Sequence, residues 1–311
     1  PTTVAGMVDA AVGGKTAINS EYGKNLIGAF HSPIAVVIDF SWLQTLSDRD
    51  YAAGLAEVVK AGFIEDGVIL DLLRGKNLGE IRADQERCRE VFTRAIAVKA
   101  NIVSQDFKED YAREALNYGH TLGHAIEIHA QYQLRHGEAV SIGMVFVAEL
   151  AAARGLIDET TVTMHRDLLK RYDLPITVDR QAWSKLLPLL SLDKKARGNT
   201  LRFVVLDAIG STKRLEDVTS TLKKLHDSKF LFDNNYNHLE RLASYESIHT
   251  NNSEEYKNLK SSFNLKISLK KKRKTNATLI CFFRFSFAKR SRHVNASILL
   301  RLFEQIQRNF S

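Results

Sequence analysis

The chain has 311 residues, a length that suits one large domain or two domains with a sizeable core. Its composition is 44% hydrophobic and 26% charged, as in an ordinary folded protein, and no apolar run approaches the roughly 20 residues that span a membrane. Cys88 and Cys281 are too far apart in sequence to suggest a disulfide framework, so we expect a cytoplasmic protein that does not enter a membrane.

The net charge of +8 is unevenly distributed. Residues 211–311 carry 20 Lys and Arg against 9 Asp and Glu, whereas residues 1–210 carry 24 against 27. The basic excess therefore says nothing about the ligand of the main body. All 17 glycines and all 4 prolines lie at or before Gly210. This break in composition predicts that residues 221–311 form a separate basic tail, disordered or aberrant.

The expected elements follow in chain order. The glycine-rich segment Val12 to Thr16, followed by Gly23-Lys24-Asn25, suits either an anion-binding backbone or two surface turns. Hydrophobic periodicity predicts a mainly helical protein with an α/β remnant at its start. Residues 35–38 and 201–206 read as strands, and residues 48–63, 85–105, 113–130, 138–155 and 158–172 read as helices.

Glu57 and Lys60 lie three residues apart beside the apolar stripe of the first expected helix. Such a pair is often a solvated surface ion pair worth a few tenths of a kcal/mol. The alternative is functional, with the carboxylate binding a cation and the ammonium group binding an anionic substrate. The spacing favours the surface pair.

Four histidines lie between residues 120 and 136. His120 and His124 are at positions i and i+4 of an expected helix, so both project from one face. Two imidazoles and a carboxylate can hold a divalent metal with one position open for substrate. The alternative is a set of core histidines bonded to backbone carbonyls, and spacing does not decide which of His120, His124, His129 and His136 bind.

Two further cations lie nearby in sequence. Arg113 is seven residues before His120, which places it two turns away on about the same face if the helix is continuous. Lys99 lies near the end of the expected helix 85–105. A solvated charge is the alternative for both, and for Lys99 it is the favoured one.

Seven segments together closely resemble the 3-dehydroquinate synthase family, over roughly residues 1–220. Among them are Val8-Asp9-Ala10-Ala11-Val12-Gly13-Gly14-Lys15-Thr16 and Leu116-Asn117-Tyr118-Gly119-His120-Thr121-Leu122-Gly123-His124-Ala125-Ile126-Glu127. The others are residues 1–3, 23–28, 54–60, 136–140 and 193–195. The resemblance implies an NAD-binding remnant at 1–47, a helical metal- and substrate-binding domain at 48–220 and an unrelated tail at 221–311.

The resemblance also implies residue roles. A divalent metal, zinc or cobalt, would be bound by Glu57, His120 and His136. NAD would contact Thr2, Thr3, Lys15, Lys24 and Thr45. Substrate binding and proton transfer would involve His124, Lys60, Lys15, Arg113, Asn117, Lys99, Asp9, Asn25, Lys194 and Lys195.

The implied reaction is the cyclisation of 3-deoxy-D-arabino-heptulosonate 7-phosphate to 3-dehydroquinate with loss of phosphate, a lyase step of aromatic amino acid biosynthesis. The partner is then a small sugar-acid phosphate, and the protein forms a homodimer. Two alternatives stay open: another sugar-phosphate cyclase, such as an inosose or valiolone synthase, and a non-catalytic remnant or half-enzyme. Arg113, Asn117 and His124 favour dehydroquinate.

Two departures from the family pattern matter. The chain starts at Pro1, after the glycine-rich element that members carry earlier, so we expect a fragment with little synthase activity of its own. Similarity fades after residue 212. We interpret the tail as a misread or misjoined sequence, and do not expect its Lys270–Lys274 run to bind nucleic acid.

Overall fold

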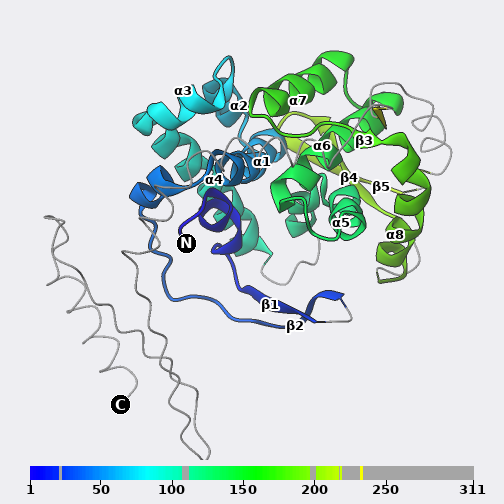
Figure 1. Ribbon diagram of the computed structural model, residues 1–311, viewed down its shortest axis with the longest axis horizontal. Helices are drawn as coiled ribbons and strands as arrows, with labels where there is room; N and C mark the ends of the chain where they lie inside the picture. Colours follow the sequence, from blue (N-terminus) through cyan, green and yellow to red (C-terminus); the bar gives the residue numbers. More distant parts are fainter. Residues whose placement is uncertain (21–22, 107–111, 197–200, 217, 219–231, 234–311) are drawn as a thin grey trace, which may run out of the picture. The chain divides into compact units, whose positions relative to one another are not determined.

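The computed structural model describes residues 1–20, 23–106, 112–196, 201–216, 218 and 232–233 (Figure 1). This part of the chain is mainly helical, as predicted. Its α-helices are α1 (Asp48–Ile64), α2 (Gly67–Leu73), α3 (Leu78–Ala83), α4 (Gln85–Gln105), α5 (His120–His129), α6 (His136–Ala153), α7 (Glu159–Arg171) and α8 (Trp183–Ala196). A short π-helix forms at η1 (Gly6–Ala10), and short 3₁₀ helices form at η2 (Phe40–Thr45), η3 (Ala112–Asn117) and η4 (Arg180–Ala182).

The described strands form three small pairs. Strands β1 (Lys15–Ser20) and β2 (Gly23–Phe30) make an antiparallel hairpin in which Ile18 lies opposite Ile27. Strands β4 (Phe203–Ala208) and β5 (Ser211–Leu215) make a second antiparallel pair. Strand β3 (Val178–Asp179) runs parallel to β6 (Phe232–Asp233).

Helix α6 lies at the centre of the core. It packs against α1, α5, α7 and β4, and the ring of Phe146 lies 5.5 Å from that of Phe203 between centroids. Within the described residues α6 is the one helix long and apolar enough to cross a membrane, but 83% of it is buried inside the protein. Its apolar sequence is therefore explained by its position in the core.

The periodic stripes of two other helices are buried as expected. Leu55, Val58, Val59 and Phe63 of α1 are buried, and so are Val91, Ala95, Val98 and Ile102 of α4. Each helix begins at a side-chain cap: Ser47 accepts a hydrogen bond from the amide of Asp50, and Asp84 accepts one from the amide of Arg87. The boundaries of both helices were predicted to within one residue.

The start of the chain differs from the prediction. Residues 35–38 belong to no helix or strand in the part of the chain that the structure describes, and Val37 is 79% exposed. The apolar run was read as a buried strand, but a strand needs a neighbour to bond its backbone groups. The two glycine-rich segments were considered as separate turns, yet Lys15 and Lys24 lie in the paired strands β1 and β2.

The predicted helix 113–130 is interrupted. Gly119 has a φ of 77°, in the left-handed region, so η3 ends and α5 starts afresh at His120. The expectation that Arg113 shares a helical face with His120 is therefore wrong. The division at residues 47 and 220 stays a prediction, and the tail with Lys270–Lys274 lies outside the described residues.

Candidate metal and substrate site

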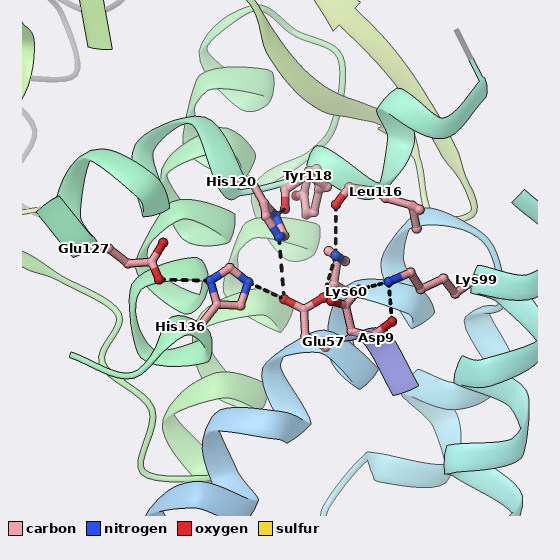
Figure 2. Close-up of polar contacts among 9 residues, drawn as sticks. All are labelled: Asp9, Glu57, Lys60, Lys99, Leu116, Tyr118, His120, Glu127 and His136. Carbon is pink, nitrogen blue, oxygen red and sulfur yellow. Dashed lines mark hydrogen bonds and ion pairs between the residues drawn. The ribbon is translucent and has the colours of Figure 1, made fainter. Parts of the chain in front are cut away.

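The site begins with two charged side chains buried on α1. Glu57 and Lys60 are each 3% exposed. The Nζ of Lys60 lies 2.5 Å from Glu57 Oε2 and donates a hydrogen bond of 2.8 Å to the carbonyl of Leu116 (Figure 2). The interpretation as a solvated surface pair is wrong, because three-residue spacing places two side chains together without telling whether another helix covers them.

Two histidines converge on the same carboxylate. His120 is the first residue of α5 and His136 the first of α6. Their Nε2 atoms lie 3.7 Å and 3.4 Å from Oε1 of Glu57 (Figure 2). One ligand atom from each of the three residues lies within 4.8 Å of the other two. The structure thus brings together a carboxylate and two imidazoles from three helices.

A glycine allows this convergence. Gly137 follows His136 in the first turn of α6, and a Cβ built on it would lie 1.7 Å from the backbone oxygen of Ala53 in α1. No side chain fits in that space, so only glycine lets the two helices approach this closely. The contact holds His136 beside Glu57, which lies one turn further along α1 than Ala53.

The residues fit a divalent cation. Both oxygens of Glu57 are buried: Oε2 pairs with the ammonium group of Lys60, and Oε1 faces the Nε2 atoms of His120 and His136. Burial alone would raise the pKa of Glu57, but Lys60, His136 and His120 together hold this pKa well below its usual range. An ionised carboxylate with two imidazoles is a donor set typical of catalytic zinc, which keeps one position for substrate.

Each histidine is held by a contact that the sequence analysis did not identify. Nδ1 of His136 lies 3.2 Å from Oε1 of Glu127, and Nδ1 of His120 lies 3.0 Å from the carbonyl of Tyr118. The hydroxyl of Tyr118 in turn bonds Nε2 of buried His165 at 2.8 Å. A signal was present for Glu127, which lies seven residues after His120 and so on the same helical face. No sequence pattern pointed to His165.

The carboxylates also act on His136. Burial would lower the pKa of His136, but the hydrogen bonds and charges of Glu127 and Glu57 raise this pKa to about 9. His120 differs, because burial and the nearby Lys60 lower its pKa well below the usual range. The two imidazoles therefore face the same carboxylate in different electrostatic surroundings.

A second pair of charges lies beside the first. Lys99 of α4 is buried, and its ammonium group bonds the backbone carbonyl of Asp9 and, at 2.6 Å, its carboxylate (Figure 2). Burial lowers the pKa of Lys99, and Asp9 offsets only part of this effect. The favoured interpretation of Lys99 as a solvated charge is wrong, since η1 covers it.

Arg113 is also buried, at 4% exposure. Its backbone amide donates a 3.0 Å hydrogen bond to Asp106, and a Cβ at Gly13 would lie 3.4 Å from its guanidinium. The guanidinium thus approaches the glycine-rich segment before β1. With Lys60 and Lys99, it gives this region three buried cationic side chains.

The remaining predicted residues lie in varied settings. His124 is exposed, with its ring 5.4 Å from His120 and 6.1 Å from His136 between centroids. Asn117 is half-buried at the end of η3 and His129 is exposed at the end of α5. Thr3 accepts a hydrogen bond from Gly6, and Thr45 donates one to Trp42, so both stabilise their own turns. Thr2 and Lys15 are exposed, Lys24 and Asn25 lie in β2, and Lys194 and Lys195 lie in the last turns of α8.

Family comparisons divide the chain at residue 53. Residues 1–53 match the sequence model described as 3-dehydroquinate synthase N-terminal, and residues 54–196 match the one described as 3-dehydroquinate synthase C-terminal. Among curated relatives, the 3-dehydroquinate synthase of Thermobifida fusca is 56% identical over 211 residues, 68% of this chain and 57% of that protein. That of Mycobacterium leprae is 51% identical over 215 residues, 69% of this chain and 60% of that protein.

Solved structures with a similar fold are sugar-phosphate cyclases. A 2-epi-5-epi-valiolone synthase from Streptomyces hygroscopicus with NAD+ and Zn2+ bound is 29% identical, with a TM-score of 0.67 over 73% of this chain and 63% of that chain. A 2-deoxy-scyllo-inosose synthase complexed with carbaglucose-6-phosphate, NAD+ and Co2+ is 26% identical, with a TM-score of 0.61 over 73% and 65%. The chain spans 57–60% of the length of the first curated relatives that it matches. On the two sequence-model matches and these relatives, the chain belongs to the 3-dehydroquinate synthase family.

Proposed function

We propose that the described residues form the metal- and substrate-binding half of a 3-dehydroquinate synthase. The reaction would be the phosphate-eliminating cyclisation of 3-deoxy-D-arabino-heptulosonate 7-phosphate to 3-dehydroquinate. One observation carries the proposal: Glu57, His120 and His136 converge beside buried cationic side chains. Names of curated relatives at 50–56% identity support the same reaction.

Glu57, His120 and His136 would hold zinc or cobalt. The bound ion would supply Lewis-acid chemistry, lowering the pKa of a substrate hydroxyl that is to be oxidised. The buried Glu57 carboxylate supports this assignment, because the Nε2 atoms of His120 and His136 converge on its Oε1. Zn2+ and Co2+ in the two solved cyclases support the choice of metal.

The cations would bind the carboxylate and phosphate of the substrate. Lys60 is fixed by Leu116 and Lys99 by Asp9, so each ammonium group is held in place before substrate arrives. Fixed cations in a buried site bind anions more strongly than mobile surface lysines, because little conformational entropy remains to be lost. We assign substrate contacts also to Arg113, Asn117, Lys15, Asn25, Lys194 and Lys195.

His124 would move protons. Its ring is exposed and lies next to both His120 and His136, where a substrate bound at the metal would be within reach. NAD contacts are assigned to Thr2, Thr3, Lys15, Lys24 and Thr45. The NAD+ bound in the two solved cyclases supports a dinucleotide cofactor.

A homodimer in the cytoplasm, acting on a small sugar-acid phosphate, completes the proposal. The carbaglucose-6-phosphate in one solved cyclase supports a phosphorylated substrate. The free, buried thiol of Cys88 suits a reducing compartment.

Zinc binding tests the metal assignment. The purified chain should bind one equivalent of zinc, measured by competition with a chromophoric chelator. Glu57→Gln and His136→Gln should each weaken zinc binding more than about 100-fold. This loss exceeds the roughly 10–100-fold loss that is usual when a residue contacting a metal ligand, and not the ligand itself, is changed. Glu149→Gln is the matched control, because Glu149 is also buried but pairs with Arg166 elsewhere. Equal affinity in all four proteins would refute the assignment.

Phosphate release tests the reaction. We expect little release from the chain alone with zinc, NAD and substrate, and clear release when the N-terminal half of a curated relative is added as a separate polypeptide. A substrate lacking the carboxylate tests the second candidate, another sugar-phosphate cyclase, which the two solved structures favour. Zinc binding without turnover of any substrate would support the alternative that the chain is a non-catalytic remnant.

A further inference from the structure

Both ring nitrogens of His136 face a carboxylate. Nε2 lies 3.4 Å from Glu57 Oε1, and Nδ1 lies 3.2 Å from Glu127 Oε1 on the opposite side of the ring (Figure 2). Glu127 comes from α5, is 4% exposed, and lies seven residues after His120 on the same face of that helix. Helix α5 therefore supplies one proposed metal ligand, His120, and through Glu127 it also contacts another, His136.

The chemistry of the two groups determines which of them donates the hydrogen bond. An ionised carboxylate only accepts hydrogen bonds, so Nδ1 of His136 must donate to Glu127. When Nδ1 carries the proton of a neutral ring, the lone pair of Nε2 points toward Glu57. A carboxylate partner also makes the metal-binding nitrogen more basic and fixes the plane of the ring.

Glu127 and His136 also belong to a second group of potential metal ligands. His124, Glu127 and His136 also form a group whose ligand atoms lie within 4.8 Å of one another. Glu127 already accepts a hydrogen bond there and His124 is exposed, whereas the buried Oε1 of Glu57 faces the Nε2 atoms of two imidazoles, at 3.7 Å from His120 and 3.4 Å from His136. The geometry therefore favours an ion at Glu57 and a supporting role for Glu127.

We propose that Glu127 is a positioning residue for the metal centre, which orients His136 and selects the tautomer whose Nε2 binds the ion. This inference rests on the proposed function. Glu127 contacts the ligand His136 and not the ion, and it makes no contact with substrate.

Zinc affinity and a cobalt spectrum test this role. Glu127→Ala should bind zinc about 10–100-fold more weakly than the unchanged chain, still at one equivalent. Glu127→Gln should lose less, because the amide oxygen can still accept from Nδ1 but carries no charge. Cobalt bound to Glu127→Ala should show shifted d–d bands. Glu149→Ala removes a buried carboxylate from the far end of α6 and should change neither measurement.

The outcomes separate the two proposals. If the unchanged chain binds no zinc, the proposed function fails. Zinc binding by the unchanged chain with equal affinity in Glu127→Ala would overturn the positioning role alone. Two equivalents of zinc, with the second lost in Glu127→Ala, would overturn it in favour of a second metal site. Should Glu127→Ala fail to fold, as judged by its melting curve, the nearly isosteric Glu127→Gln decides, because unchanged affinity and bands in that variant contradict the proposal.

Discussion

His165 links the site to the stability of the folded chain. Its ring is fully buried, stacks on Phe63 at 3.5 Å between centroids, and bonds both the hydroxyl of Tyr118 and the carbonyl of Thr161. Tyr118 supplies the carbonyl that holds His120. A residue on α7 thus supports a proposed metal ligand on α5 through two hydrogen bonds and one backbone segment.

This buried ring should make the fold sensitive to acid. Burial lowers the pKa of His165 from 6.5 to about 4 in the folded chain. Its contribution to the free energy of unfolding is complete above pH 6.5 and declines as the pH falls toward 4, by up to about 3 kcal/mol. His165→Gln removes the titrating group, so urea unfolding of this variant should lose less stability between pH 6.5 and pH 4 than the unchanged chain does.

The exposed His129, at the end of α5, provides the control. His129→Gln should leave the pH dependence of unfolding as it is in the unchanged chain. Parallel pH profiles for His165→Gln and the unchanged chain would contradict the prediction.

Single residues were predictable from the sequence only in part. The spacing of His120 and His124 indicated a shared helical face, and the family resemblance named Glu57, His120 and His136 together. Spacing said nothing of burial, so Glu57 and Lys60 were read as a surface pair and Lys99 as a solvated charge. Glu127 and His165 act through contacts between helices, which no local pattern records.

At the scale of elements, the close approach of α1 and α6 determines the site. The backbone of Gly137 contacts that of Ala53, and no Cβ fits between them. Helices normally pack with their axes 8–10 Å apart, according to the side chains at the contact. A glycine at the crossing brings the start of α6 close enough for its histidine to reach a carboxylate on α1.

Gly137→Ala should therefore separate α1 from α6. The alanine methyl group would overlap a backbone oxygen that cannot turn away, so we expect a loss of stability of about 1–3 kcal/mol or more and weaker zinc binding. Gly79→Ala in α3 is the control: its Cβ meets only Asn77 Oδ1 at 3.4 Å, so it should be neutral or stabilise by up to about 1 kcal/mol. Unfolding in urea measures both. A Gly137→Ala variant as stable as the unchanged chain would show that the helices can shift without cost.

Elements with strong helical periodicity were predicted well. Helices α1 and α4 have clear caps and apolar stripes, and the strand β4 overlaps its prediction. The break at Gly119 was missed because glycine within an apolar helical pattern does not by itself end a helix. The run 35–38 was predicted as a strand from its composition, but strand formation depends on a neighbour that sequence does not specify.

At the scale of the whole molecule, the described hydrophobic core lies within residues 4–218. It contains α6 at its centre and every helix that carries a proposed metal ligand. All of these elements lie in the first of the two units of the chain, residues 1–247. The stability of the site should therefore depend on the first unit.

A chain ended after Ser247 should keep its melting temperature and its zinc affinity. Every described element remains in that chain, including β6 at Phe232–Asp233. Differential scanning calorimetry and chelator competition provide the measurements. A lower melting temperature would show that the stability of the core depends on residues 248–311. Salt-dependent heparin binding that disappears with residues 248–311 would revive the view of the tail as an appendage for polyanions.

The three proposed ligands are separated by 63 and 16 positions along the chain, at residues 57, 120 and 136. An ion held by all three would act as a cross-link, because α1, α5 and α6 cannot come apart while each keeps its ligand atom in place. The unfolded chain has no preformed metal site, so the folding equilibrium depends on the concentration of free metal. At a metal concentration a thousandfold above Kd, binding would add about 4 kcal/mol to the free energy of unfolding. Scarcity of metal in the cell would then lower the amount of folded protein as well as its activity.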